Sequence, residues 1–166
     1  MSDDHIDRKI AVIFATDVVG YSKSIEADEA QTIKNLRACK KLLDQNLKKH
    51  GGYIFNTAGD SVLAEFSSAV AALECAAEFQ AQMKERNKSS DASQRMEFRI
   101  GVNMGDVVKE DGNLYGDGVN IAARLEFFAQ PNGISISKPV YDFVKGKTGL
   151  VFNDLGIQQV KENKFQ

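Results

Sequence analysis

The chain has 166 residues, of which 43% are hydrophobic and 27% are charged, and its formal net charge is −2. This length and composition are enough for one globular domain with its own core, and they exclude the low hydrophobicity of disordered proteins. A charge this close to neutral provides no basic surface for nucleic acid. We therefore expect one domain over residues 1–166 and no nucleic-acid partner.

The first strand and helix are predicted from the apolar pattern. Residues 9–16 form a nearly continuous apolar run with several β-branched members, which is typical of a strand covered on both faces. A glycine-containing turn at 18–22 leads into a long amphipathic helix, which Gly51 and Gly52 end.

Two short strands and a second helix follow. The strands are expected at 53–55 and 61–66, and residues 56–60 between them read as a hairpin turn. The helix begins after Ser67 or Ser68, either of which can act as its N-cap. Its predicted buried side consists of Leu73, Ala76, Phe79 and Met83.

The remaining elements begin after a polar loop at 86–95. A strand is expected at 96–104, with 105–108 extending it or turning away, and a third helix at 118–128. Further elements are a strand at 134–136, a helix at 138–144 and a strand or pair of strands at 151–160.

This order predicts an α+β domain with helices on one face of a mostly antiparallel sheet. Its first two thirds follow the β-α-β-β-α-β order of a ferredoxin-like core, to which the carboxyl-terminal strands and helices are added.

The two cysteines, Cys39 and Cys75, both lie within helical patterns, so we expect buried thiols. A disulfide framework would need more cysteines, and a zinc site would need closely spaced ligands. The first residues are polar and acidic, unlike a signal peptide, and no apolar run has the length of a membrane span. We expect a cytoplasmic protein with no membrane segment, cut from a longer chain because its end at 160–166 is abrupt.

Two acidic residues are candidates for metal binding. Asp17 closes the first apolar strand, and Asp60 lies at the tip of a hairpin that pairs with this strand in a ferredoxin-like sheet. Two facing carboxylates repel each other unless cations lie between them, and hard oxygen ligands suit Mg²⁺ or Mn²⁺. Taken alone, the position of Asp17 favours a helix cap or a turn residue.

Further residues suit the binding of phosphate. Gly20 permits close backbone approach, and free N–H groups at the following helix start can hold phosphate oxygens. Asn120 and Arg124 stand four residues apart, on one face of the third predicted helix. Arg124 suits transition-state charge, but an ion pair with the neighbouring Glu126 is an alternative explanation.

Four segments together resemble the successive motifs of class III adenylate and guanylate cyclases, in the family's order and over about residues 8–160. They are FATDVVGYS at 14–22, TAGDSVLAEF at 57–66, FRIGVNMGD at 98–106 and LYGDGVNIAARLE at 114–126. Four ordered motifs are far more specific than one. The resemblance implies a nucleotidyl cyclase that converts ATP or GTP to the 3′,5′-cyclic monophosphate and pyrophosphate.

The resemblance also implies roles for individual residues. Asp17 and Asp60 would bind two Mg²⁺ or Mn²⁺ ions together with the Val18 carbonyl, Asn120 would orient the ribose, and Arg124 would stabilise the transition state. In this family the metal aspartates and the Asn/Arg pair come from different subunits, which implies a homodimer with two sites.

Other implied roles concern the nucleotide. The segment with Gly20, Tyr21 and Ser22 would lie at the phosphates, and Lys161, or less directly Lys109, is the candidate for holding the triphosphate.

The positions that select the purine depart from the family pattern. Asn56 and Asn113 stand where adenylate cyclases usually carry lysine and aspartate, and the glutamate and cysteine of guanylate cyclases are absent as well. An amide both donates and accepts hydrogen bonds, so this pair leaves the base open, with ATP favoured by the family as a whole. Two alternatives are a cyclase-like dimerisation or nucleotide-sensing module without useful turnover and, with less support, a generic ferredoxin-like interaction domain. Regulatory domains are expected outside this segment.

Overall fold

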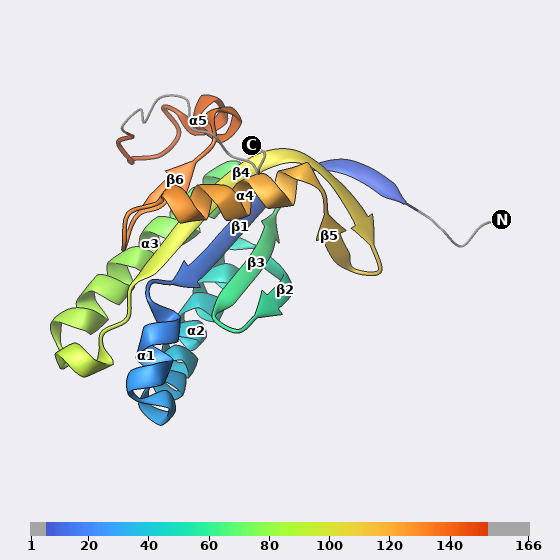
Figure 1. Cartoon of the computed structure of the whole chain (residues 1–166). Coiled ribbons are helices and arrows are strands. Elements are labelled where there is room, and N and C mark those ends of the chain that lie inside the picture. The colour runs from blue at the N-terminus through green and yellow to red at the C-terminus, as the bar shows by residue number, and fades with distance from the viewer. Residues whose placement is uncertain (1–5, 153–166) are drawn as a thin grey trace.

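The computed structural model describes residues 6–152 (Figure 1). Its elements in chain order are β1 (Asp7–Val18), α1 (Tyr21–Ala27), α2 (Glu29–His50), β2 (Tyr53–Ala58), β3 (Ser61–Phe66), α3 (Ala69–Lys88), the 3₁₀ turn η1 (Ala92–Gln94), β4 (Phe98–Glu110), β5 (Asn113–Tyr115), α4 (Asp117–Phe128), β6 (Ile134–Ile136) and α5 (Lys138–Val144). No helix of this described part is long and apolar enough to cross a membrane.

The strands form one sheet in the order β2-β3-β1-β4-β5, and β6 pairs with β4 in parallel. The central strand β1 pairs antiparallel with β3 on one side and with β4 on the other. With helices between β1 and β2 and between β3 and β4, the chain follows the expected βαββαβ order. The predicted α+β fold with a mostly antiparallel sheet is therefore confirmed.

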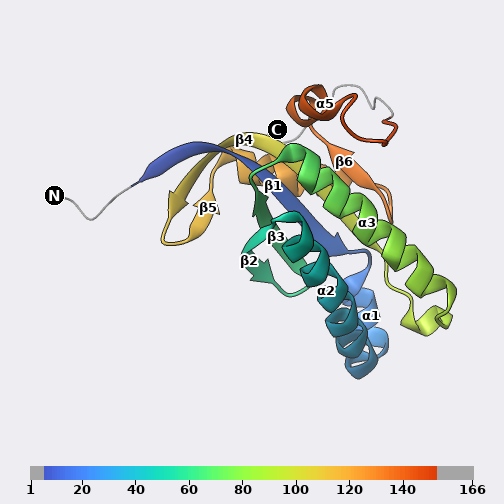
Figure 2. The same ribbon diagram turned by 180° about the vertical axis from the view of Figure 1, so that it is seen from behind.

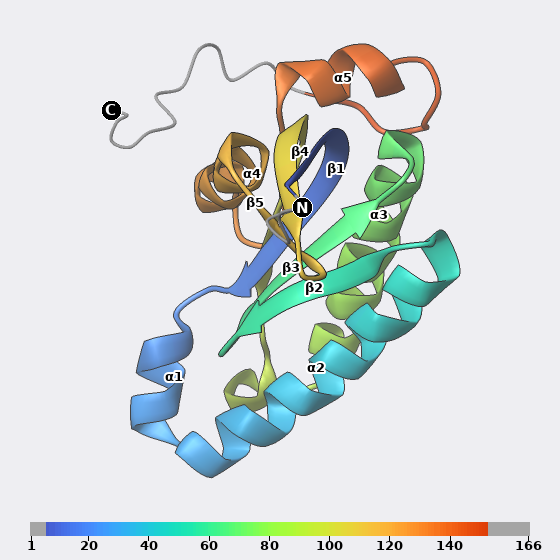
Figure 3. The ribbon, with the colours of Figure 1, turned by 90° about the vertical axis from the view of Figure 1, so that its right-hand side faces the viewer.

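Helices cover both faces of the sheet, so the expectation that they lie on one face was wrong. α2, α3 and α5 pack on the face that includes Val12 and Phe14, and α4 packs on the opposite face, over Ala11, Ile13 and Ala15. Figures 1 and 2 show these two faces from the front and from behind, and Figure 3 shows α4 and α3 on opposite sides. This double cover explains why the middle of β1 is apolar on both sides.

The segment between β1 and β2 contains two helices where the sequence indicated one. α1 and α2 are separated at Asp28, whose backbone is extended with φ −160°. The Asp28 carboxylate accepts a hydrogen bond from the Gln31 amide and so caps α2. Gly51, with φ +81°, ends α2 as expected.

α3 begins at the predicted place. The Ser68 hydroxyl accepts a hydrogen bond from the Ala71 amide at 3.1 Å, which makes Ser68 the N-cap. The helix continues to Lys88, three residues into the segment expected as a loop. The apolar residues predicted on its inner side are all buried, namely Leu73, Ala76, Phe79 and Met83.

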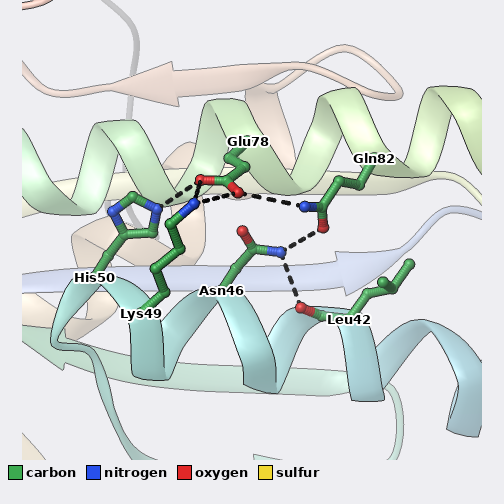
Figure 4. Close-up of polar contacts among 6 residues, drawn as sticks. All are labelled: Leu42, Asn46, Lys49, His50, Glu78 and Gln82. Carbon is green, nitrogen blue, oxygen red and sulfur yellow. Dashed lines mark hydrogen bonds and ion pairs between the residues drawn. The ribbon is translucent and has the colours of Figure 1, made fainter.

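Polar side chains join α2 to α3 (Figure 4). Glu78 accepts a hydrogen bond from Lys49 Nζ at 2.8 Å and contacts His50 Nε2 at 2.9 Å. The hydrogen bonds from Lys49 and then from His50 hold the pKa of Glu78 below its ordinary value. Asn46 Nδ2 donates to Gln82 Oε1 at 2.7 Å, so the two helices are linked at more than one point.

Both cysteines are buried, as predicted. Burial raises the pKa of the Cys39 thiol above its ordinary value. Burial, followed by the nearby charge of Glu78, raises the pKa of Cys75 to about 12. Both side chains are therefore unreactive core thiols at neutral pH.

The boundary of β2 differs from the prediction, while β4 follows one of the two courses expected at 105–108. β2 continues to Ala58, which pairs with Ser61, so the hairpin turn is Gly59-Asp60 and Asn56 lies inside a strand. β4 runs without interruption through 105–108. At the carboxyl end, residues 151 and 152 belong to no helix or strand, and the rest of the predicted 151–160 region lies outside the described residues.

Candidate active site

Asp17 is the penultimate residue of β1, and its side chain points to the face that α4 covers. In the antiparallel pairing of β1 with β4, Asp17 lies opposite Arg99. The Arg99 guanidinium contacts both carboxylate oxygens, with Nη2 at 3.3 Å from Oδ2 and Nε at 3.4 Å from Oδ1. Asp17 is half-buried, so this charge contact is partly shielded from solvent.

Arg99 also binds the helix above it. Its Nη2 atom lies 3.5 Å from Oε2 of Glu126, a buried residue of α4. Its guanidinium lies 5.4 Å from the centre of the Phe127 ring. One arginine thus connects the acid at the end of β1 with the carboxyl-terminal half of α4.

Asp60 occupies the second position of the two-residue β2–β3 turn. Its Oδ2 atom accepts a hydrogen bond from the Val18 amide at 2.9 Å, which places the carboxylate against β1 directly after Asp17. The Gly59 carbonyl accepts a hydrogen bond from Lys40 Nζ of α2 at 3.0 Å. The expectation that the hairpin brings the second acid to the end of the first strand agrees with this geometry.

Negative charge accumulates where these elements meet. Burial first, then a hydrogen bond with Asp17 and the charges of Asp17 and Asp60, raise the pKa of Glu126 to about 8, while the charge of Arg99 opposes the rise. The guanidinium therefore does not fully offset the nearby carboxylates.

Divalent Mg²⁺ or Mn²⁺ suits this donor set of hard oxygen atoms. Within residues 6–152 no group of three or more His, Cys, Asp or Glu side chains is arranged to hold a metal ion. The candidate protein ligands are thus two carboxylates, of Asp17 and Asp60, and the Val18 carbonyl.

The segment after β1 turns sharply into α1. Gly20 has φ +65°, in the left-handed region that favours glycine, and its carbonyl accepts the Ser24 amide of the first helical turn. Tyr21 packs partly against the core, and Ser22 is exposed. The turn therefore follows the candidate metal ligands directly.

Asn120 and Arg124 both lie on the exposed side of α4, as their spacing predicts. The alternative that Arg124 forms a surface ion pair with Glu126 was wrong, because Glu126 points inward and pairs with Arg99. Phe127 lies on the same exposed side with 68% of its surface accessible. The outer face of α4 thus presents an amide, a guanidinium and an aromatic ring.

Asn56 and Asn113, which stand at the positions expected to contact the base, lie on β2 and β5, two strands that approach each other. Asn56 is exposed. The Asn113 Nδ2 atom donates to the Tyr115 hydroxyl at 3.2 Å, and its Oδ1 atom accepts from the Leu114 amide at 2.8 Å. The side chain of Asn113 is thus oriented by the protein itself.

Of the two candidates for holding the triphosphate, Lys109 lies within the described residues. Lys109 is exposed near the end of β4. Lys161 lies outside the described residues.

Sequence reasoning did not identify Arg99 or the inward role of Glu126. Arg99 belongs to the third motif, but only the strand register places it opposite Asp17. Glu126 was noted only as a neighbour of Arg124. Its inward direction follows from the packing of α4, where Ala122 and Leu125 share the buried side.

Comparisons with known proteins identify the family. Residues 4–166 match the model of the adenylate and guanylate cyclase catalytic domain. The chain is 43% identical over 162 residues, 97% of its length, to a protein of Rhizobium meliloti (strain 1021) whose name assigns it provisionally as adenylate cyclase 3. It covers 28% of that relative.

Solved structures of cyclase domains are similar to this chain as well. An adenylate/guanylate cyclase/hydrolase from Silicibacter pomeroyi has a TM-score of 0.88 and 39% identity, with 95% of this chain and 92% of that chain covered. A non-canonical dimeric guanylyl cyclase domain of the RhoGC fusion protein from the aquatic fungus Blastocladiella emersonii has a TM-score of 0.72 and 25% identity, with 84% and 85% covered. The chain belongs to the family of adenylate and guanylate cyclase catalytic domains.

Proposed function

We propose that this chain converts a purine nucleoside triphosphate, ATP in preference to GTP, to the 3′,5′-cyclic monophosphate and pyrophosphate. The observation that carries the proposal is the meeting of Asp17 and Asp60 at the end of β1, where the Val18 amide orients the Asp60 carboxylate. Only one Asp60 oxygen is used by that hydrogen bond, which leaves the other available as a ligand.

In this proposal Asp17, Asp60 and the Val18 carbonyl hold two Mg²⁺ or Mn²⁺ ions. The ions supply positive charge for the triphosphate and acidify the ribose 3′-hydroxyl. Arg99 and Glu126 keep the Asp17 carboxylate directed to the α4 side of the sheet.

The remaining residues act on the nucleotide. Asn120 orients the ribose, and Arg124 stabilises the charge that develops on the phosphate oxygens. The turn from Gly20 to Ser22 lies along the phosphates, and Lys161 binds the triphosphate.

We infer that the working unit is a homodimer in which each site combines the acids of one chain with α4 of the other. Asn120 and Arg124 are exposed, and neither forms an ion pair or side-chain hydrogen bond with another residue of the described range 6–152. An exposed Phe127 beside them suits burial against a second protein surface. Because the chain spans less than a third of the Rhizobium meliloti relative, we also propose that regulatory domains lie outside it. We propose separately that the protein works in the cytoplasm.

The test is direct. The purified chain at high concentration is incubated with Mn²⁺ and either ATP or GTP, and cyclic product is measured by chromatography for the wild type and for Asp17→Ala. We expect cyclic AMP from the wild type and none from the variant. Product from GTP alone reverses the choice of base, and no product from either nucleotide with a proven dimer rejects the cyclase proposal.

One observation favours a second candidate, a nucleotide-sensing or dimerisation module without turnover. Arg99 contacts both oxygens of Asp17, so a guanidinium can neutralise this acid without a metal ion. The asparagines at positions 56 and 113 also depart from the usual base-reading residues. Binding of nucleotide by a dimer that forms no cyclic product supports this candidate.

A further inference from the structure

The turn that presents Asp60 is held by few contacts. Gly59, its first residue, has φ +60°, and a Cβ atom placed there would meet no other atom within 4 Å. The turn is therefore not packed against the rest of the protein at Gly59. Its position relative to β1 depends on hydrogen bonds.

Within residues 6–152, two hydrogen bonds reach the turn from outside the hairpin. On one side the Val18 amide of β1 donates to Asp60 Oδ2 at 2.9 Å. On the other side Lys40, from the middle of α2, donates from Nζ to the Gly59 carbonyl at 3.0 Å. These two bonds hold adjacent residues of the turn from two different elements.

Lys40 donates to this carbonyl from a helix that is itself joined to its neighbour. Its side chain is half-buried along α2, and α2 is fixed to α3 by the contacts of Lys49 and Glu78. Within the described residues no carboxylate forms an ion pair with Lys40, so its ammonium is directed to the turn.

We propose that Lys40 is a positioning residue that holds the Gly59-Asp60 turn so that the Asp60 carboxylate stays at the end of β1. This inference rests on the proposed function for the role of Asp60 as a metal ligand. The hydrogen bond from Lys40 to the Gly59 carbonyl is itself a property of the metal-free fold. Removal of the ammonium leaves the strand pairing of the hairpin and the Val18 bond to hold the turn, and lowers the fraction of molecules in which Asp60 is correctly placed.

The experiment compares three variants of the full chain. Lys40→Met keeps the length of the side chain but removes the donor, Lys40→Arg restores a charged donor, and Lys41→Met is the matched control, because Lys41 is the exposed neighbour on α2. The first measurement is amide hydrogen exchange of Val18 without metal, since this amide reports whether Asp60 is in place. The second is the dissociation constant of Mn²⁺, measured from the electron paramagnetic resonance signal of the free ion.

We expect Val18 exchange to be about three- to tenfold faster in Lys40→Met and unchanged in Lys41→Met, with Lys40→Arg close to the wild type. Mn²⁺ binding should weaken by a similar factor in Lys40→Met only. The thermal midpoint of each variant shows that the fold is retained. Unchanged Val18 exchange in a folded Lys40→Met protein overturns the proposal.

The failure of the proposed function would look different. If the wild type binds no Mn²⁺, or if Asp17→Asn binds it equally well, the metal site is rejected whatever Val18 does. If Val18 exchange is still faster in Lys40→Met in that case, Lys40 is a structural residue of the turn and has no role in metal binding.

Discussion

At the scale of single residues, Arg99 is the centre of the site's electrostatics. It contacts Asp17 on β1 and Glu126 on α4, so one guanidinium contacts two acidic side chains. Glu126 is buried and has a pKa raised to about 8, which means that near neutral pH the folded protein holds a proton that the unfolded chain releases. This arrangement makes the stability of the metal-free protein depend on pH.

Without divalent cations, the free energy of unfolding should fall as pH rises from about 4.5 to about 8, the ordinary and raised pKa values of Glu126. Protonated Glu126 contributes its full stabilisation below the ordinary pKa of 4.5, and this stabilisation is lost as pH rises through the raised pKa of about 8. The free energy of unfolding falls by at most about 1.4 kcal/mol per pH unit in this range. Glu126→Gln stays neutral and should show a flatter profile in urea unfolding with a chelator present.

Glu74→Gln is the control for this prediction, because Glu74 is exposed on α3, which packs on the opposite face of the sheet from α4. Its profile should follow the wild type. An equally steep fall in Glu126→Gln would show that another group is responsible.

At the scale of elements, the placement of α4 depends on a close approach of two backbones. A Cβ atom on Gly101 of β4 would lie 2.3 Å from the Glu126 amide nitrogen and 2.5 Å from the Ala122 carbonyl oxygen. Asn103, two residues along the strand, donates from Nδ2 to the Gly118 carbonyl at 3.0 Å. The strand thus fixes both ends of the helix that carries the proposed nucleotide-binding side chains.

Gly101→Ala should displace α4, because backbone atoms cannot rotate away as a side chain can. We expect a loss of about 1–3 kcal/mol in the free energy of unfolding and a severe loss of cyclase activity. Urea unfolding and the assay for cyclic product measure the two effects. Gly149→Ala is the matched control, since a Cβ atom there meets nothing within 4 Å, and wild-type stability in Gly101→Ala would contradict the prediction.

At the scale of the whole molecule, the proposal places the two halves of each active site on different chains. Within one chain the acids lie at the end of β1, whereas Asn120 and Arg124 face outward from α4. A two-fold dimer is the simplest assembly in which one chain's outward face meets the other chain's acids twice.

Asp60→Asn and Arg124→Ala proteins, each inactive alone, should therefore regain activity when mixed. Random exchange gives half heterodimers with one intact site each, so we expect about a quarter of the wild-type rate. Subunit exchange is verified independently with differently tagged chains. A mixture as inactive as its parents after proven exchange would reject the shared site.

Local patterns were sufficient for most of the fold. The apolar run at 9–16, the buried side of α3 and the helix at 138–144 were correctly predicted because hydrophobic periodicity and capping act over a few residues. The meeting of Asp17 with Asp60 was also predicted, since a βαββαβ order fixes which strands are neighbours. The roles of the site residues stay predictions that the experiments above address.

By itself, the sequence determined the βαββαβ order of the core, the α+β class and the two acids at the end of the central strand. Only the tertiary structure decided that Asp17 lies opposite Arg99, that Glu126 points inward and that α4 covers the second face of the sheet. The physical reason is that strand register and helix placement depend on contacts between residues far apart in the chain. A shift of one residue in β4 would turn Arg99 to the other face, and no local pattern around Arg99 encodes that choice.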